Sequence, residues 1–351
     1  MLHTASSGSI PHLTEIYLRL DDGETIGIGE VRANIAYLNG FAEATVVECA
    51  ATAVREVDWR RDPVELIATM ADWGAPMIVP VRALIDCALH DFVARREHLT
   101  VAAWLGAAGQ TVIRETNQTL FWSSFDEFLA QAQAYVDRGF RDLKVRVAAA
   151  DFAEDMRRIA ALRAGFGTQV KIAADANGRW SATEALEKLD ALAAYDLAYV
   201  EQPVPPGDWA AVDRLAERSP LPVMLDESVA TPDDVTRICS YRGRLLAHLK
   251  LVKLGGIAPT VAAARRLSEA GVPFMIGQMN EGAAATAAAL HVACATSPAF
   301  AELYGADGLI DDPASGVSYT AGTVHADHAS GLGVAFDAAA THLIGDFRYG
   351  S

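Results

Sequence analysis

Between about residues 142 and 304, short apolar runs alternate with longer amphipathic segments. Segments such as ATEALEKLDALAAY (182–195) place apolar residues three and four positions apart, the pattern of a helix with one buried face. The unit repeats about every 25 residues, which is typical of βα units and predicts a parallel sheet. The apolar runs are LKVRV (143–147), VKIAADAN (170–177), LAYVEQP (197–203), PVMLDES (222–228), LAHLKLVK (246–253), PFMIGQ (273–278) and FAELYG (300–305).

With RETNQTL (114–120) as the first run, this pattern supplies eight strands. Eight consecutive βα units favour a closed barrel over an open sheet. The first hundred residues differ: HLTEIYLRLDDGETIGIGE (12–30) predicts an antiparallel hairpin with DDGE as its turn. Two helices are predicted after it, over 42–57 and 80–96.

We therefore predict an α/β protein built as a modified TIM barrel, a (β/α) barrel, with an α+β capping domain. Residues 1–108 form the capping domain, and residues 109–314 form the catalytic barrel. The tail, residues 315–351, is Gly- and Ala-rich and has no barrel unit left to build. We expect the tail to pack back on the N-terminal region and complete the capping domain.

Composition excludes several classes of protein. A hydrophobic content of 51% excludes a disordered or fibrous chain, and a net charge of −16 argues against nucleic acid and anionic membranes as partners. The cysteines are scattered without CxxC spacing, which favours free thiols in a reducing compartment: Cys49, Cys87, Cys239 and Cys294. Without a long uncharged apolar stretch or a signal-like start, we expect a cytoplasmic protein.

Polar residues stand at the carboxyl ends of successive apolar runs, where barrel enzymes build their active sites. Asp175, Glu201 and Asp226 are spaced by 26 and 25 residues, so neighbouring strands bring one carboxylate each to the mouth. Three converging carboxylates repel one another unless a cation lies among them, and hard oxygen ligands suit Mg²⁺. The alternative is that each acid only caps the helix that follows it.

Two lysines flank these acids: Lys144 precedes them and Lys250 follows Asp226 by 24 residues. A lysine inside an apolar strand either pairs with an acid or serves as a base. Beside a metal ion and partly desolvated, Lys250 would have a lowered pKa and suit proton abstraction near neutral pH. His248 shares the face of Lys250, where it either orients that lysine or packs as a hydrogen-bonded core histidine.

Taken together, LKVRV, DANGRW, VEQP, LDES and HLKLVKLGG resemble the muconate-lactonizing subgroup of the enolase superfamily, and IGIGE and ALIDCALHDF extend the resemblance to the capping domain. The resemblance implies that Asp175, Glu201 and Asp226 bind Mg²⁺, with Mn²⁺ as the alternative. It places Lys144 and Lys250 on opposite sides of a small carboxylate substrate. The metal would stabilise the enediolate formed when the α-proton leaves. A homo-oligomer is also implied.

One position departs from the subgroup, because Arg146 replaces the second lysine of a Lys-x-Lys motif. A guanidinium stays protonated, so Arg146 suits holding an anion better than removing a proton. One-base chemistry is therefore favoured, as in a lyase (dehydratase) or cycloisomerase. The alternatives are a racemase or epimerase of an amino-acid derivative, with Lys144 as the second base, and a catalytically silent barrel with a binding role.

Substrate contacts are expected from the loops at the mouth and from the capping domain. The Asp-x-Asp expected after the eighth strand in dipeptide epimerases is absent, which argues against a dipeptide substrate. Arg32, Asn34 and Glu281 are further candidates. A solvated loop explains Arg32, Asn34 and Tyr37 equally well, and Trp122 either stacks on a substrate ring or only fills the rim. The predicted substrate-binding residues are Tyr37, Trp122, Asn177, Gln278, Asn280 and Glu302.

Overall fold

The computed structural model describes most of the chain. The described residues are 2–4, 8–10, 12–109, 111–149, 151–327 and 329–348, with backbone only for the first two ranges. Within these residues, no helix combines the length and the apolar character needed to cross a membrane.

An eight-stranded parallel sheet forms the barrel, and its strands follow one another in chain order. The backbone N–H of Asn117, just before the first strand, donates to Ala301 in the last strand over 3.0 Å, which brings the two edges together. The strands are β6 (Gln118–Leu120), β7 (Asp142–Arg146), β8 (Lys171–Asp175), β9 (Val200–Glu201), β10 (Val223–Leu225), β11 (Leu245–Lys250), β12 (Phe274–Gly277) and β13 (Phe300–Glu302).

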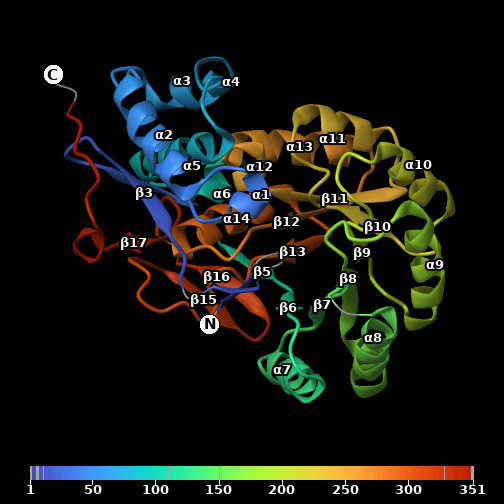
Figure 1. Ribbon diagram of the computed structural model, residues 1–351. Helices are drawn as coiled ribbons and strands as arrows, with labels where there is room; N and C mark the ends of the chain where they lie inside the picture. The colour runs from blue at the N-terminus through green and yellow to red at the C-terminus, as the bar shows by residue number, and fades with distance from the viewer. Residues whose placement is uncertain are drawn as a thin grey trace.

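Helices surround this sheet (Figure 1). Three of them begin with a capping box at Ser124, Ser181 and Thr231, in which side chains satisfy the free N–H groups of the first turn. The barrel helices are α7 (Phe125–Asp137), α8 (Phe152–Phe166), α9 (Ala182–Leu192), α10 (Trp209–Arg218), α11 (Pro232–Cys239), α12 (Leu251–Leu254), α13 (Ile257–Glu269) and α14 (Ala283–Thr296), with 3₁₀ turns η1 (Gly167–Gln169) and η2 (Ala193–Tyr195).

Apolar side chains fill the barrel below its mouth. They come from neighbouring strands of the barrel and the residues beside them, and Tyr199 meets Phe300 edge-on with ring centroids 4.9 Å apart. These side chains form a separate small apolar cluster inside the barrel. Its buried members are Ala173, Tyr199, Met224, Leu246 and Met275.

The barrel is confirmed, but three details of the predicted pattern are wrong. RETNQTL splits: β5 (Ile113–Glu115) pairs with the tail, and only Gln118–Leu120 joins the barrel. The run LAHLKLVK ends as a strand at Lys250, and α12 begins at the next residue. The described residues after β13 continue as strands and the 3₁₀ turn η3 (Ala338–Ala340), so the eighth unit has no α-helix.

The N-terminal region forms the predicted hairpin, β3 (Glu15–Asp21) and β4 (Ile26–Arg32), packed on a long helix. We call β3, β4 and the helices up to α6 the cap. It has its own apolar core and lies on the side of the barrel opposite α9 in Figure 1. Its helices are α1 (Ala36–Asn39), α2 (Glu43–Glu56), α3 (Pro63–Ala68), α4 (Met70–Trp73), α5 (Val79–Arg96) and α6 (Val101–Trp104); a short hairpin, β1 (Leu2–Thr4) with β2 (Gly8–Ile10), precedes it.

The tail packs back on the cap, as predicted. Arg95 of α5 donates to the carbonyl of Val334 over 2.7 Å, and Asp91 accepts the N–H of Leu332 over 2.6 Å. The boundaries at residues 108 and 314 stay predictions. The tail strands are β14 (Ala314–Ser315), β15 (Val317–Thr320), β16 (Thr323–Ala326) and β17 (Ala335–Phe336).

Candidate active site

Strand register brings the predicted polar residues to one end of the barrel. Arg146 pairs with Asp175 across β7 and β8, and Asp175 pairs with Glu201 across β8 and β9. On the other side, Lys250 is level with Gly277, which is level with Glu302. Because parallel strands keep their carboxyl ends together, side chains separated by more than a hundred residues meet in one buried cluster.

Asp226, just beyond β10, lies between two ammonium groups. Lys250 donates to its Oδ2 over 2.8 Å, and Lys253 of α12 donates to its Oδ1 over 2.5 Å. Burial alone would raise the pKa of Asp226, but these two lysines outweigh burial and hold the pKa well below its usual range. Asp226 is therefore ionised at any ordinary pH.

Lys144 is enclosed by three carboxylates. Its Nζ lies 3.0 Å from Glu201 and 3.6 Å from Asp175, and it forms a closer ion pair with Glu302. The side chain is fully buried, which would lower the pKa of Lys144, but the three acids raise it well above its usual value. In this arrangement Lys144 compensates charge and is not a free base.

Arg146 reaches the same end of the barrel two residues further along β7. It forms an ion pair with Asp175 and donates to Asn177 Oδ1 over 2.6 Å. Asn177 in turn donates to Glu227 over 3.1 Å. Burial, followed by the charges of Asp226 and Asp175, raises the pKa of Glu227 to about 7.

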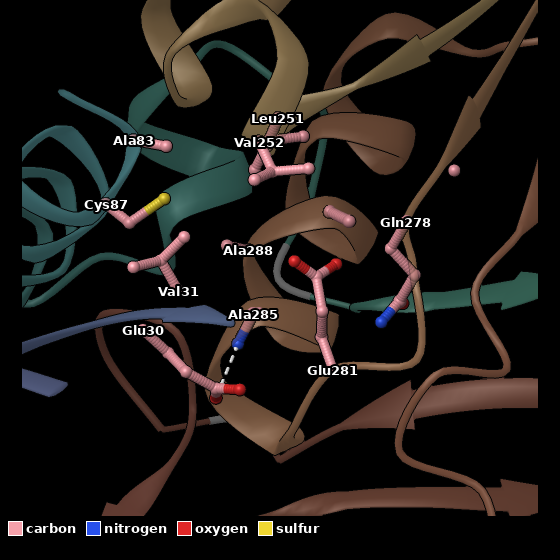
Figure 2. Close-up of a pocket in the computed structure, with 12 residues that line it drawn as sticks. Glu30, Val31, Ala83, Cys87, Leu251, Val252, Gln278, Glu281, Ala285 and Ala288 are labelled. Atoms are coloured by element: carbon pink, nitrogen blue, oxygen red, sulfur yellow. Dashed lines mark hydrogen bonds between the residues drawn. The ribbon is translucent and has the colours of Figure 1, made fainter. Parts of the chain in front are cut away.

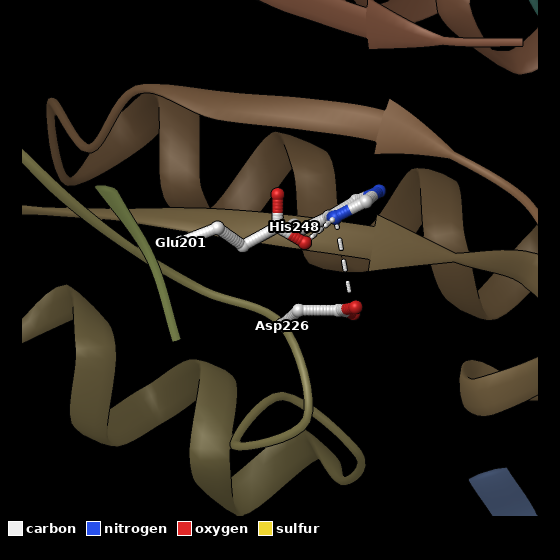
Figure 3. Close-up of side chains that lie close together, drawn as sticks. All are labelled: Glu201, Asp226 and His248. Carbon is white, nitrogen blue, oxygen red and sulfur yellow. Dashed lines mark hydrogen bonds and ion pairs between the residues drawn. The ribbon is translucent and has the colours of Figure 1, made fainter. Parts of the chain in front are cut away.

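His248 lies inside the barrel and contacts acids rather than Lys250. Its Nδ1 is 3.0 Å from Glu201 and 3.8 Å from Asp226. Figure 3 shows the side chains of Glu201, Asp226 and His248 close together. A Cβ at position 277 would lie 2.0 Å from His248 Nε2, so only glycine leaves room for the ring. Of the two interpretations of His248, the packed and hydrogen-bonded one describes its contacts.

Ligand atoms of Glu201, Asp226 and His248 lie within 4.8 Å of one another. Two of the three predicted metal ligands therefore belong to this compact group, while Asp175 lies next to it on β8 and faces Arg146. Oxygen atoms dominate the donor set, and the carboxylates already attract ammonium and guanidinium groups. The residues present thus fit a hard divalent cation such as Mg²⁺ or Mn²⁺.

The lowered pKa expected for Lys250 is not present in this arrangement. Burial would lower it, but the carboxylates of Asp226, Glu302 and Glu201 raise the pKa above its usual value. The prediction assumed a metal ion that shares the charge of these acids. Asp226, in direct contact with Lys250, and the charges of the other two acids keep it protonated.

The predicted substrate contacts fall into two groups. Tyr37 of α1 and Trp122 after β6 are 36% and 38% exposed, so both are open to solvent, and Trp122 stacks with the guanidinium of Arg158. Glu302 is buried and held by Lys144 and Asn117.

Gln278, Asn280 and Glu281 lie on the β12–α14 loop, residues 278–282. Gln278 donates to Thr286 over 2.8 Å, and the Asn280 carbonyl accepts from Arg32 over 3.2 Å. Arg32 also donates to the Asn34 side chain over 2.7 Å. Arg32 therefore holds this loop, and Asn34 holds the guanidinium of Arg32.

Two residues that contact the site were absent from the predicted set. Lys253 follows Lys250 by three residues in an apolar stretch. On a helix this spacing places two side chains on the same face, so the spacing could have indicated that Lys253 also reaches the site. Glu227 follows Asp226 directly, but nothing in a single sequence distinguishes it from a solvated neighbour.

Residues 127–340 match a protein-family model described as Enolase C-terminal domain-like. The chain is 30% identical to the L-Ala-D/L-Glu epimerase of Bacillus subtilis, over 72% of this chain and 70% of that protein. It is 28% identical to muconate cycloisomerase 1 of Rhodococcus opacus, over 72% and 69% of the two chains. Its fold is similar to that of the N-succinyl Arg/Lys racemase from Bacillus cereus, with a TM-score of 0.88, 23% identity and coverage of 96% and 92%.

Proposed function

This chain belongs to the Enolase C-terminal domain-like family, within the enolase superfamily, and we propose that it is a divalent-metal-dependent enzyme that removes the proton next to a small acid's carboxylate. One observation carries the proposal. Carboxylates follow three adjacent strands, as Asp175, Glu201 and Asp226, and Lys250 lies 2.8 Å from the last of them. This combination supplies both a cation site and a base beside it.

We propose that Asp175, Glu201 and Asp226 hold the cation, with Mg²⁺ as the first choice and Mn²⁺ as the second. An α-proton next to a carboxylate is very weakly acidic, because its removal builds up negative charge on the carboxylate oxygens. A bound divalent cation would stabilise that charge and share the acids that now raise the pKa of Lys250. Lys250 would then accept the proton at its Nζ.

The partners of Arg146 favour chemistry on one face of the substrate. Arg146 remains protonated, and Asp175 and Asn177 hold it in place, so it suits contact with a substrate anion. Lys144 is surrounded by acids and has no free face in the described part of the site. A cycloisomerase or a lyase needs only the one base, and a relative named muconate cycloisomerase supports this choice.

A racemase or epimerase of an amino-acid derivative is the second candidate. Relatives named as epimerases favour it, including the one with 30% identity. Inversion needs a proton acceptor on each face of the substrate, and Lys144 would have to supply the second. That role requires Lys144 to leave at least one of its three carboxylates.

Proton NMR in D₂O, with a panel of small hydroxy, amino and unsaturated acids and added Mg²⁺, tests the proposal. We expect metal-dependent exchange of an α-proton that falls by about 10²–10⁴-fold in Lys250→Ala. Lys171→Ala is the matched control, because Lys171 is exposed at the opposite end of β8. Inversion with deuterium incorporation selects the racemase, and water loss or ring formation selects the first candidate. Metal binding without exchange of any acid contradicts both and favours a silent barrel.

A further inference from the structure

Helix α14 begins without a cap of its own. Gly282 precedes it and has no side chain to accept the free N–H groups of the first turn. Glu30, at the end of β4 in the cap, takes that role from 252 residues away. It accepts the N–H of Gly282 over 2.6 Å at Oε1, and those of Ala284 and Ala285 over 2.9 and 3.0 Å at Oε2. Figure 2 shows Glu30 directed at the start of this helix.

Asp312 completes the arrangement from the other end of the chain. It accepts the N–H of Ala283 over 2.7 Å and is itself held by the N–H of Ala314 over 2.8 Å and the hydroxyl of Tyr17 over 3.3 Å. Two carboxyl groups from segments outside the helix thus accept the free N–H groups of its first turn.

Glycine at position 282 is required for this close approach. A Cβ there would lie 2.6 Å from Glu30 Oε1 and 3.0 Å from Asp312 Oδ2. Any side chain would therefore push both carboxylates away from the helix.

The cap holds the β12–α14 loop at a second point. Arg32 lies two residues after Glu30 on β4, hence on the same face of the strand, and donates to the Asn280 carbonyl over 3.2 Å. Met279 directly precedes Asn280 in this loop, and its Sδ is 3.6 Å from the Nζ of Lys250. The cap, the loop and the proposed base are therefore in continuous contact.

Little free space lies between Glu30, the β12–α14 loop and the segment that follows Lys250. A cavity of about 20 Å³, room for about one water molecule, lies between Glu30, Cys87 and Glu281 on one side and Leu251 and Val252 on the other (Figure 2). Leu251 and Val252 directly follow Lys250 in the chain. With so little space to absorb a shift, a change at Glu30 passes to the loop and to the segment that carries Lys250.

We propose that Glu30 is a positioning residue: by anchoring the start of α14 it sets the place of Met279 and, through it, of the Lys250 ammonium. The proposal rests on the proposed function only for the role of Lys250 as base. The contacts themselves are independent of any substrate.

The experiment compares Glu30→Gln with Asp62→Asn. The amide that replaces the Glu30 carboxylate keeps one acceptor oxygen but directs N–H donors at backbone N–H groups, so part of the cap is lost. Asp62 caps α3 in the same way, accepting the N–H of Val64 over 2.8 Å, and no site residue described above is among its partners. The readout is NMR of ¹³C-methyl methionine, with the Met279 signal assigned by Met279→Leu.

We expect the Met279 methyl signal to shift or broaden in Glu30→Gln and to stay unchanged in Asp62→Asn. If Glu30→Gln does not fold, Glu30→Asp, which keeps the charge one methylene short, must move the same signal. An unchanged Met279 signal together with faster amide exchange in the first turn of α14 would show that Glu30 is only a structural cap and would overturn the proposal.

Activity supplies a second readout. We expect Glu30→Gln to lower kcat for α-proton exchange by about ten- to a hundredfold with little change in KM, because misplacement of a base acts on the chemical step. A rise in KM with unchanged kcat would contradict positioning. If the wild type exchanges no acid, the proposed function fails, while the Met279 signal still decides the role of Glu30.

Discussion

The mouth of the barrel and the seam between cap and barrel both bury carboxylates, but different partners compensate their charge. In the mouth, side-chain cations face the acids. We call this the mouth cluster: Lys144, Arg146, Asp175, Glu201, Asp226, Lys250, Lys253 and Glu302. In the seam, backbone N–H groups face three of the acids: Glu30, Glu281 and Asp312. We call this the seam cluster: Glu15, Glu30, Glu281 and Asp312.

The two clusters differ in protonation. Burial raises the pKa of Glu302, but Lys144 and other cations outweigh this and lower it to about 2. Burial also raises the pKa of Glu30, where the neighbouring Asp312 adds to it and the helix N–H groups offset only part, so the value is about 8. Side-chain cations thus outweigh burial at Glu302, whereas backbone N–H groups do not outweigh it at Glu30. Elsewhere in the mouth, burial raises the pKa of Asp175 and Glu201 in spite of the nearby cations.

The difference has a functional meaning. Ammonium and guanidinium groups on long side chains can exchange one anion for another, which suits the proposed binding of a substrate carboxylate and a cation in the mouth. Backbone N–H groups in a helix cannot move to a new partner, so the seam has one arrangement. We infer that the side chains of the mouth can change partners, whereas the contacts of the seam fix the position of the cap on the barrel.

The largest effect is expected from Lys144→Met. This change removes the ammonium shared by Glu201, Glu302 and Asp175, and buried acids are left without compensation. Breaking a buried ion pair in this way costs about 3–5 kcal/mol of unfolding free energy. Urea unfolding in metal-free buffer measures it. A second change, Glu302→Gln, should restore part of the loss, and a loss below about 1 kcal/mol would show that the mouth acids do not depend on Lys144.

The contrast also explains what the sequence could predict. Asp175, Glu201 and Asp226 follow equivalent strands of a repeating unit, so regular spacing was enough to bring them together. The eight-strand barrel and the hairpin of the cap followed from the same periodic patterns. Glu30 and Asp312 have no such regularity, because their partners are backbone N–H groups of a helix far away in the chain.

Errors arose where a local pattern has two structural outcomes. The run RETNQTL is uniformly strand-like, and only pairing with the distant tail assigns Ile113–Glu115 to another sheet. Likewise, the apolar residues after Lys250 suit a strand or a helix, and the packing of α12 on α5 decides between them.

A smaller effect is expected in the seam from Gly282→Ala. The added Cβ would meet both carboxylates at about 3 Å or less, and such overpacking costs about 1–3 kcal/mol. Gly165 in α8 is the matched control, since a Cβ there meets nothing within 4 Å. Gly165→Ala should stabilise the protein by about 0.5–1 kcal/mol, because alanine favours a helix. Thermal unfolding of both variants tests the pair, and equal responses would refute a tight seam.

The smallest effect is the pH dependence of the seam. The pKa of Glu30 is about 8 in the folded protein against about 4.5 when unfolded, so between these values the folded state binds a proton that the unfolded state lacks. Stability from this group is present below pH 4.5 and is lost as pH rises towards 8. One proton contributes at most about 1.4 kcal/mol per pH unit. Glu30 is electrostatically coupled to nearby acids such as Asp312 and Glu281, so its proton binding is spread over a wider pH range. We therefore expect the free energy of unfolding to change by less than about 1 kcal/mol per pH unit.

Urea unfolding of the wild type and Glu30→Gln between about pH 5 and 8.5 measures this slope. The variant cannot titrate at position 30, so the stability advantage of the wild type should shrink as pH rises and level off above about pH 8. If the stability of the wild type relative to the variant instead increases with pH, the N–H groups of α14 outweigh burial and keep Glu30 ionised. The seam would then hold its acids charged, as the mouth does, and only the mobility of the compensating groups would still separate the two regions.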